Sequence, residues 1–340
     1  MSLVELTLTR LRLFFREPSA VFWTFIFPIL LTIALGVAFR NRPPEPVAAA
    51  VEEGQGSAAL ALALAEDPRI EARVLGPREA RAALRAGRVA LVVSAGPPLR
   101  YAFDPTRPES RLARALVDDA VQRAAGRVDP VSAVEAKVVE PGARYIDFLV
   151  PGLLGLNIMS SGMWGVAFVI VETRQKKLLK RLLATPMRRG EFLLSFVFLR
   201  MLFLVLELPV LLGFARLAFG VSVQGSLALL VLVAFLGALA FAGIGLLVAA
   251  RATNTQTASG LINLVMMPMF LLSGVFFSAT HFPAVMQPAI RALPLTALID
   301  ALRAVMNEGA GAAAVARPAL LLAVVSLASF ALALRAFRWS

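Results

Sequence analysis

Long apolar runs separated by short polar segments set the pattern of this chain. Six runs approach or exceed the roughly 20 apolar residues that a helix needs to cross a bilayer. They cover 20–39, 148–171, 193–219, 226–250, 257–277 and 318–334, the last being short. Only the third carries charges, at Arg200, Glu207 and Arg216. The pattern predicts an α-helical polytopic membrane protein with six transmembrane helices, the first within 19–40 and the others within 145–340.

Residues 41–144 follow a different pattern, in which short apolar strands alternate with short helices. Ile70, Ala72 and Val74 alternate with charged residues, as in a half-buried strand. The segment predicts strands at 47–51, 70–74, 89–93 and 99–103, and helices at 57–66, 77–86 and 109–125. Strands alternating with helices indicate an α/β domain, here inserted between the first two spans. About 100 residues can bury a modest core and fold alone.

Two further segments flank the spans. Residues 1–18 predict an interfacial N-terminal helix, because Val4, Leu8, Leu11 and Phe15 form one apolar stripe. Residues 278–315 lie between the last two apolar runs and are broken by prolines, yet they are too apolar for a free loop. We expect them to form an outer re-entrant segment of short helices that dips into the outer leaflet, packed on protein.

Composition and charge agree with a membrane protein and argue against nucleic-acid binding. Hydrophobic residues make up 59% and charged residues 16%, against about 45–50% and 25% in soluble proteins. The net charge is +12, but residues 40–144 hold 16 basic and 14 acidic residues, a net of +2. The remaining basic residues gather beside the spans, on one side if the N-terminus is inside. This positive-inside pattern predicts cytoplasmic termini and an extracytoplasmic 41–144.

A basic segment at 172–189 joins the second and third apolar runs. Leu178, Leu179, Leu182 and Leu183 form one helical stripe, while Lys176, Lys177, Lys180 and Arg181 form the opposite face, and Pro186 ends the helix. Such an amphipathic helix can dock into a protein partner or bind anionic lipid, and the residues alone leave both readings open.

Polar residues within the spans allow two readings as well. Asn157, Ser160 and Asn263 can hold helices together or line a translocation path. Glu207 is costly at membrane depth, so it either has a function or has a structural partner. Arg200 precedes it by seven residues, about 10 Å along the helix, and is predicted to be too far away for a direct pair.

Signals for enzyme chemistry are missing from the sequence. There is no cysteine and a single histidine, His281, and no cluster has the spacing of metal ligands. Neither G-x-S-x-G nor the phosphate-binding G-x-x-x-x-G-K-[ST] occurs. We therefore expect no metal site and no ATP hydrolysis by this chain, so that any ATP-driven motor is a separate polypeptide.

Five segments in order resemble the type-2 ABC exporter permeases. The basic segment Lys180-Arg-Leu-Leu-Ala-Thr-Pro186, between Glu172 and Glu191, resembles their cytoplasmic signature. The others are Arg16-Glu-Pro18 with Phe27-Pro28, Tyr145-Ile-Asp147 with Pro151-Gly152, Ser273-Gly-Val-Phe-Phe277, and Leu293-Pro-Leu-Thr296 with Asp300 and Arg303. The large insertion after the first span resembles one subgroup. Many members carry Gly-Thr where this chain has Lys177-Leu178, a departure that makes the helix more basic and more apolar.

The resemblance implies a role for two sets of residues. The first set would couple the chain to an ATPase: Glu172, Arg174, Lys176, Lys177, Leu178, Leu179, Arg181, Leu182, Leu183, Thr185 and Pro186. The second set would line a translocation path between spans two and five: Asn157, Ser160, Met163, Asn263, Met267 and Phe270.

The resemblance also implies partners and a function. The expected partners are cytoplasmic ABC ATPase subunits, a second copy of the chain or a homologous permease, and membrane lipid, but no nucleic acid. ATP and Mg would bind the ATPase, and this chain would bind no cofactor. The expected function is export of a hydrophobic or amphipathic drug, lipid or natural product across a bacterial inner membrane. The alternative is a signalling or mechanotransmitting subunit that acts on an extracytoplasmic partner.

Overall fold

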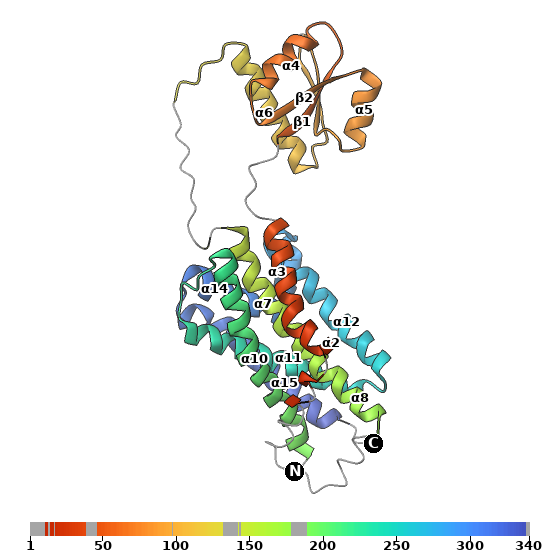
Figure 1. Ribbon diagram of the computed structural model, residues 1–340, viewed down its shortest axis with the longest axis vertical. Coiled ribbons are helices and arrows are strands. Elements are labelled where there is room, and N and C mark those ends of the chain that lie inside the picture. The colour runs from red at the N-terminus through yellow and green to blue at the C-terminus, as the bar shows by residue number, and fades with distance from the viewer. Residues whose placement is uncertain are drawn as a thin grey trace. The chain divides into compact units, whose positions relative to one another are not determined.

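The computed structural model in Figure 1 divides the chain into two compact units, which are described separately. One unit is Asn41–Lys137, and the other combines Met1–Arg40 with Val138–Ser340. The structure describes residues 11–12, 14–16, 18–38, 46–96, 98–131, 142, 144–177 and 189–337.

The smaller unit is built on a four-stranded sheet with the order β2-β1-β3-β4. Its strands are β1 (Val47–Glu52), β2 (Ile70–Leu75), β3 (Leu91–Ser94) and β4 (Arg100–Ala102). The central strand β1 runs parallel to β2 and β3, whereas β4 runs antiparallel to β3. The strands form where the apolar pattern predicts them.

Helices cover both faces of this sheet (Figure 1). The helices are α4 (Ser57–Ala65), α5 (Pro77–Arg85) and α6 (Pro108–Ala124). On one face of the sheet Val51 packs with Leu64 of α4 and Val117 of α6. On the other face the preceding residue, Ala50, packs with Ala80 of α5. Because both faces are covered, β1 is apolar throughout its centre rather than alternating.

The larger unit is helical. One continuous helix comprises α2 (Pro18–Val21), the π-helical turn η1 (Phe22–Ile26) and α3 (Phe27–Ala38), and a second comprises α7 (Tyr145–Met163), the π-helical turn η2 (Trp164–Phe168) and α8 (Val169–Gln175). The other long helices are α10 (Arg189–Phe219), α11 (Leu227–Arg251), α12 (Thr255–Leu272), α14 (Pro294–Glu308) and α15 (Ala312–Ala336). Short helical pieces lie between α12 and α14: η3 (Ala279–His281), η4 (Ala284–Met286) and α13 (Gln287–Arg291).

Five helices among the described residues are long and apolar enough to cross a membrane. The unit is therefore a multi-pass helical membrane domain. The first apolar run forms a helix whose strongly apolar part, Thr24–Val37, is shorter than the other five. Whether it completes a sixth span stays a prediction.

One sequence expectation about this unit is wrong. The final span was expected to be short and to begin at Pro318, but α15 begins at Ala312 and carries Pro318 inside. The segment before it therefore ends at 311 rather than 315, and its re-entrant course stays a prediction. Prolines inside membrane helices are tolerated where neighbours satisfy the freed backbone. Near the N-terminus Phe15 is 52% exposed. The ring of Phe14 packs against that of Phe203, with 4.2 Å between their centres. Most of the predicted interfacial helix lies outside the described residues, so it stays a prediction.

Helix α11 forms the centre of the larger unit, against α7, α10, α14 and α15. Glycines allow this close approach. A Cβ added at Gly162 of α7 would lie 2.8 Å from the Cβ of Phe241 in α11. One at Gly155 would lie 2.7 Å from Ile299 Cγ1 in α14. Close backbone packing of this kind is how membrane helices associate without a hydrophobic driving force.

The start of α7 is tied to the segments that follow α12. Arg303 of α14 donates to the carbonyl oxygens of Gly274 (2.6 Å) and Phe148 (3.1 Å), and its guanidinium carbon lies 3.6 Å from the centre of the Phe148 ring. The Tyr145 hydroxyl donates to the carbonyl of Phe276 at 2.8 Å. Three of the segments that carry the resemblance therefore meet in one network.

The core of the smaller unit can be tested with a matched pair in α4. Leu64 is fully buried, whereas Leu62 is 72% exposed. In residues 41–137 expressed alone, Leu64→Ala should cost about 2–5 kcal/mol of unfolding free energy through the cavity it leaves, whereas Leu62→Ala should stay within about 0.5 kcal/mol. Circular dichroism during urea unfolding measures both. Equal effects of the two changes would contradict the assigned core.

Candidate functional site

A cavity of about 910 Å³ lies between the helix α2–η1–α3, the helix α7–η2–α8 and α10. Its wall is rich in aromatic rings: Phe14, Phe27, Trp164, Phe168, Phe196 and Phe203. Polar side chains interrupt that wall: Thr24, Asn157, Ser160, Ser161, Glu172, Arg200 and Glu207. Along the second helix the cavity runs from Leu153 in α7 to Glu172 in α8. An apolar pocket of this size with a few polar groups is the usual form of a small-molecule site.

Two π-helical turns border the cavity. Thr24 of η1 and Trp164 and Phe168 of η2 all line it. Pro28 lies two residues after the end of η1, and its ring occupies the place of a backbone donor, which accounts for an irregular turn there. Gly165 of η2 also lines the cavity, and a Cβ added there would meet no atom within 4 Å.

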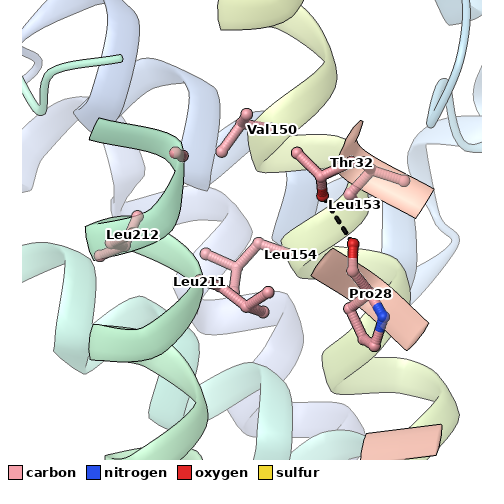
Figure 2. A pocket seen from close by; sticks show the side chains of 8 residues that line it. Pro28, Thr32, Val150, Leu153, Leu154, Leu211 and Leu212 are labelled. Atoms are coloured by element: carbon pink, nitrogen blue, oxygen red, sulfur yellow. Dashed lines mark hydrogen bonds between the residues drawn. The ribbon is translucent and has the colours of Figure 1, made fainter. Parts of the chain in front are cut away.

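At its Leu153 end the cavity meets a packed layer of three helices. Figure 2 shows Pro28 and Thr32 of α3 beside Val150, Leu153 and Leu154 of α7 and Leu211 and Leu212 of α10. These side chains enclose only about 10 Å³, roughly the space of one water-sized sphere. The Thr32 hydroxyl is satisfied, since it donates to the Pro28 carbonyl at 2.7 Å. Pro28 and Leu153 line both spaces, so the large cavity narrows to a small one at this end.

Arg200 and Glu207 of α10 form a direct ion pair in the cavity wall. Nη1 of Arg200 lies 2.9 Å from Oε2 of Glu207, and the two side chains are 3% and 1% exposed. The sequence expectation that they are too far apart is wrong, because it counted helix rise alone. A long arginine side chain lying along the helix covers two turns, and burial of both charges in an apolar wall makes pairing strongly favourable.

The predicted path residues fall into three groups. Asn157 and Ser160 line the cavity. Met163 is fully buried in the core with α11. Asn263 and Met267 are exposed on α12, and Phe270 is half-buried there. The structure therefore brings two of the six together at the cavity, while the α12 residues lie outside it.

The end of α8 shows how the coupling segment begins. Glu172 and Arg174 belong to the continuous helix, which ends at Gln175. Lys176 pairs with Glu172 at 2.8 Å, and Lys177 has a left-handed backbone with φ of 56°. The predicted helix that placed Lys176 and Lys177 on its basic face is therefore interrupted at this point. A left-handed residue after a helix is usually glycine, since other side chains are strained there.

Arg174 joins the end of α8 to two other elements. Its Nη1 donates to the carbonyl of Ala252 after α11 at 2.9 Å, and its guanidinium carbon lies 5.0 Å from the centre of the Phe337 ring after α15. It points into the helix bundle rather than toward a docking surface. The other predicted coupling residues, Leu178, Leu179, Arg181, Leu182, Leu183, Thr185 and Pro186, lie outside the described residues.

A comparison with protein-family models decides the class of the chain. The model of the ABC-2 family transporter proteins matches residues 18–335. The chain belongs to the ABC-2 transporter family. It is a type-2 ABC permease and a multi-pass membrane protein.

Curated relatives agree with this membership. The chain is 27% identical over 206 residues to ABC transporter G family member 20 of Dictyostelium discoideum. The matched region covers 60% of this chain and 28% of that protein. It is 26% identical over 174 residues to the protein of Escherichia coli K12 named "Probable multidrug ABC transporter permease YbhS", covering 50% and 45%. It is 27% identical over 169 residues to nodulation protein J of Rhizobium leguminosarum bv. trifolii, covering 48% and 63%. The chain thus spans only part of the length of each relative.

Replacing one partner of the buried ion pair should lower the stability of the protein more than replacing both partners together. Glu207→Leu leaves a buried guanidinium unpaired, which costs about 3–5 kcal/mol, whereas Arg200→Met with Glu207→Met replaces the pair by apolar side chains at little cost. Arg216→Met, at an exposed position of the same helix, is the control. Thermal unfolding of the purified variants in detergent ranks their stabilities. A double variant less stable than Glu207→Leu would refute the pairing.

Proposed function

We propose that this ABC-2 permease is the membrane subunit of an ATP-driven exporter. It takes a hydrophobic or amphipathic molecule from the cytoplasm or the inner leaflet into the aromatic cavity and releases it on the other side. The observation that carries the proposal is the cavity itself, about 910 Å³ bordered by aromatic rings and by a few polar groups. A subunit that only transmits force has no use for such a space.

The proposed direction rests on charge and on the form of the cavity. The basic residues beside the spans assign the termini and the 172–189 segment to the cytoplasmic side. Glu172 at the end of the cavity would then lie near the cytoplasm, and the packed layer around Leu154 would lie toward the outer side. A cavity that is wide toward the cytoplasm and narrow toward the outer side would suit an exporter that loads from inside.

The proposed partners are two cytoplasmic ABC ATPases, which bind ATP and Mg, and a second permease copy. The continuous helix from α7 to α8 supports a mechanical link, because it carries the cavity wall at Ser160 and the start of the coupling segment at Lys177. ATP binding would bias two arrangements of that helix. By the same orientation, the α/β unit 41–137 would be extracytoplasmic.

A substitution that places a bulky side chain in the cavity tests transport directly. Gly165→Leu places a side chain into the open space of η2 and should lower transport at least about tenfold, while Gly213→Leu in α10, where a Cβ also meets nothing but which lies outside the cavity, should not. The measurement is ATP-dependent uptake of hydrophobic dyes and lipid analogues into inside-out vesicles that contain the permease with its ATPase.

Co-purification of the ATPase with both variants controls for assembly. Normal uptake by a properly assembled Gly165→Leu variant would contradict the proposal and favour the alternative, a subunit that signals through its α/β unit without moving a substrate.

A further inference from the structure

Lys177 is the position at which the helical sequence pattern and the structure disagree. Neither glycine nor proline occurs between Gly165 and Pro186, so the sequence favours one helix through this stretch. The structure instead ends α8 at Gln175 and gives Lys177 a left-handed backbone with φ of 56°. Natural sequences break local rules of this kind mainly at functional sites.

The backbone of Lys177 is strained, and few contacts hold it. Among the residues that the structure describes, Lys177 alone is a non-glycine residue with positive φ. The left-handed form of such a residue is disfavoured by roughly five- to thirtyfold against the right-handed form. Its N–H donates to the carbonyl of Arg174 at 3.0 Å. Its side chain is exposed, and within the described part of the chain its ammonium group has no hydrogen bond or ion pair. Strain that the surroundings do not enforce can be released.

The helix that precedes this break is fixed to the bundle. Arg174 donates to the carbonyl of Ala252 at 2.9 Å, and its guanidinium carbon lies 5.0 Å from the centre of the Phe337 ring. Glu172 pairs with Lys176 at 2.8 Å and also lines the large cavity. A displacement of the end of α8 therefore reaches the cavity wall. A left-handed residue just after it lets the following segment change direction without moving that wall.

We propose that Lys177 is a two-state switch in the coupling segment. In the permease without its ATPase, Lys177 is left-handed and α8 ends at Gln175. When the ATPase docks, Lys177 becomes right-handed, and α8 continues into the amphipathic helix that the sequence predicts up to Thr185. The single helix then transmits movement of the ATPase to the cavity wall. This states how the partner engages the permease, and so rests on the proposed function.

Glycine and alanine at position 177 separate the backbone effect from the charge. Both substitutions remove the same ammonium group. Glycine accepts the left-handed form without cost, whereas alanine retains the strain of lysine. In the continuous helix alanine is in turn favoured over glycine. The two preferences add, so the ratio of continuous to broken helix should be about thirtyfold lower in Lys177→Gly than in Lys177→Ala.

Two spin labels measure this ratio in the full-length permease. The chain has no cysteine, so Thr173→Cys with Lys180→Cys provides the only two thiols. In a continuous helix these positions share one face and lie about 10.5 Å apart along the axis, which gives strong dipolar broadening of the EPR spectrum. We expect weak broadening in the permease alone. Addition of the ATPase should give strong broadening with Lys177 or Lys177→Ala, and far less with Lys177→Gly.

The matched control is the same pair of substitutions at Lys176, whose φ is already −70°. Lys176→Gly and Lys176→Ala should differ by only about fivefold, because helix propensity alone separates them. Equal broadening for glycine and alanine at position 177 would overturn the proposal. An equal loss in both variants would assign the effect to charge and overturn it as well. Strong broadening in the permease alone would do the same, since α8 would then be continuous before docking.

Dye uptake distinguishes this proposal from the proposed function. In Lys177→Gly, ATP hydrolysis by the assembled complex should continue while uptake falls at least about tenfold, because the continuous helix is rarely populated. Uptake by this variant at the level of Lys177→Ala would contradict the role of the switch in coupling. Labels that respond to the ATPase as expected, in a permease that moves no dye or lipid analogue, would refute the exporter function and leave the switch at Lys177 standing.

Discussion

Close packing of one face of α7 is the constraint on which the rest of the larger unit depends. Gly155 and Gly162 allow α14 and α11 to approach that face so closely that a single added Cβ would collide. The opposite face, with Asn157 and Ser160, is then left to border the cavity. Since α7 continues through η2 into α8, the same helix also positions the start of the coupling segment.

Charged side chains in the wall of a cavity within an apolar bundle are costly unless they have partners. Arg200 and Glu207 avoid this cost by pairing, which removes the net charge from the wall. Aromatic rings cover most of the remaining wall. The pair is therefore a structural element of α10.

Periodicity predicts most of the fold because burial in this chain is regular. Period-2 alternation located β2, and long apolar runs located the five spanning helices. Two features escaped prediction for physical reasons. The Arg200–Glu207 contact depends on side-chain reach rather than on helix rise, and the π-helical turn at Trp164 has no proline beside it to predict it. Local composition does not separate Ser160, at the cavity, from Met163, in the core.

Ser160 and Met163 offer the most direct test of the account, which holds that Ser160 borders a loading cavity whereas Met163 is packed in the core. The chain has no cysteine, so Ser160→Cys and Met163→Cys each introduce a single reactive thiol. In inside-out vesicles, a small charged thiol reagent added to the cytoplasmic side should label the Cys at 160 much faster than the Cys at 163. Equal rates, or faster labelling at 163, would contradict the account.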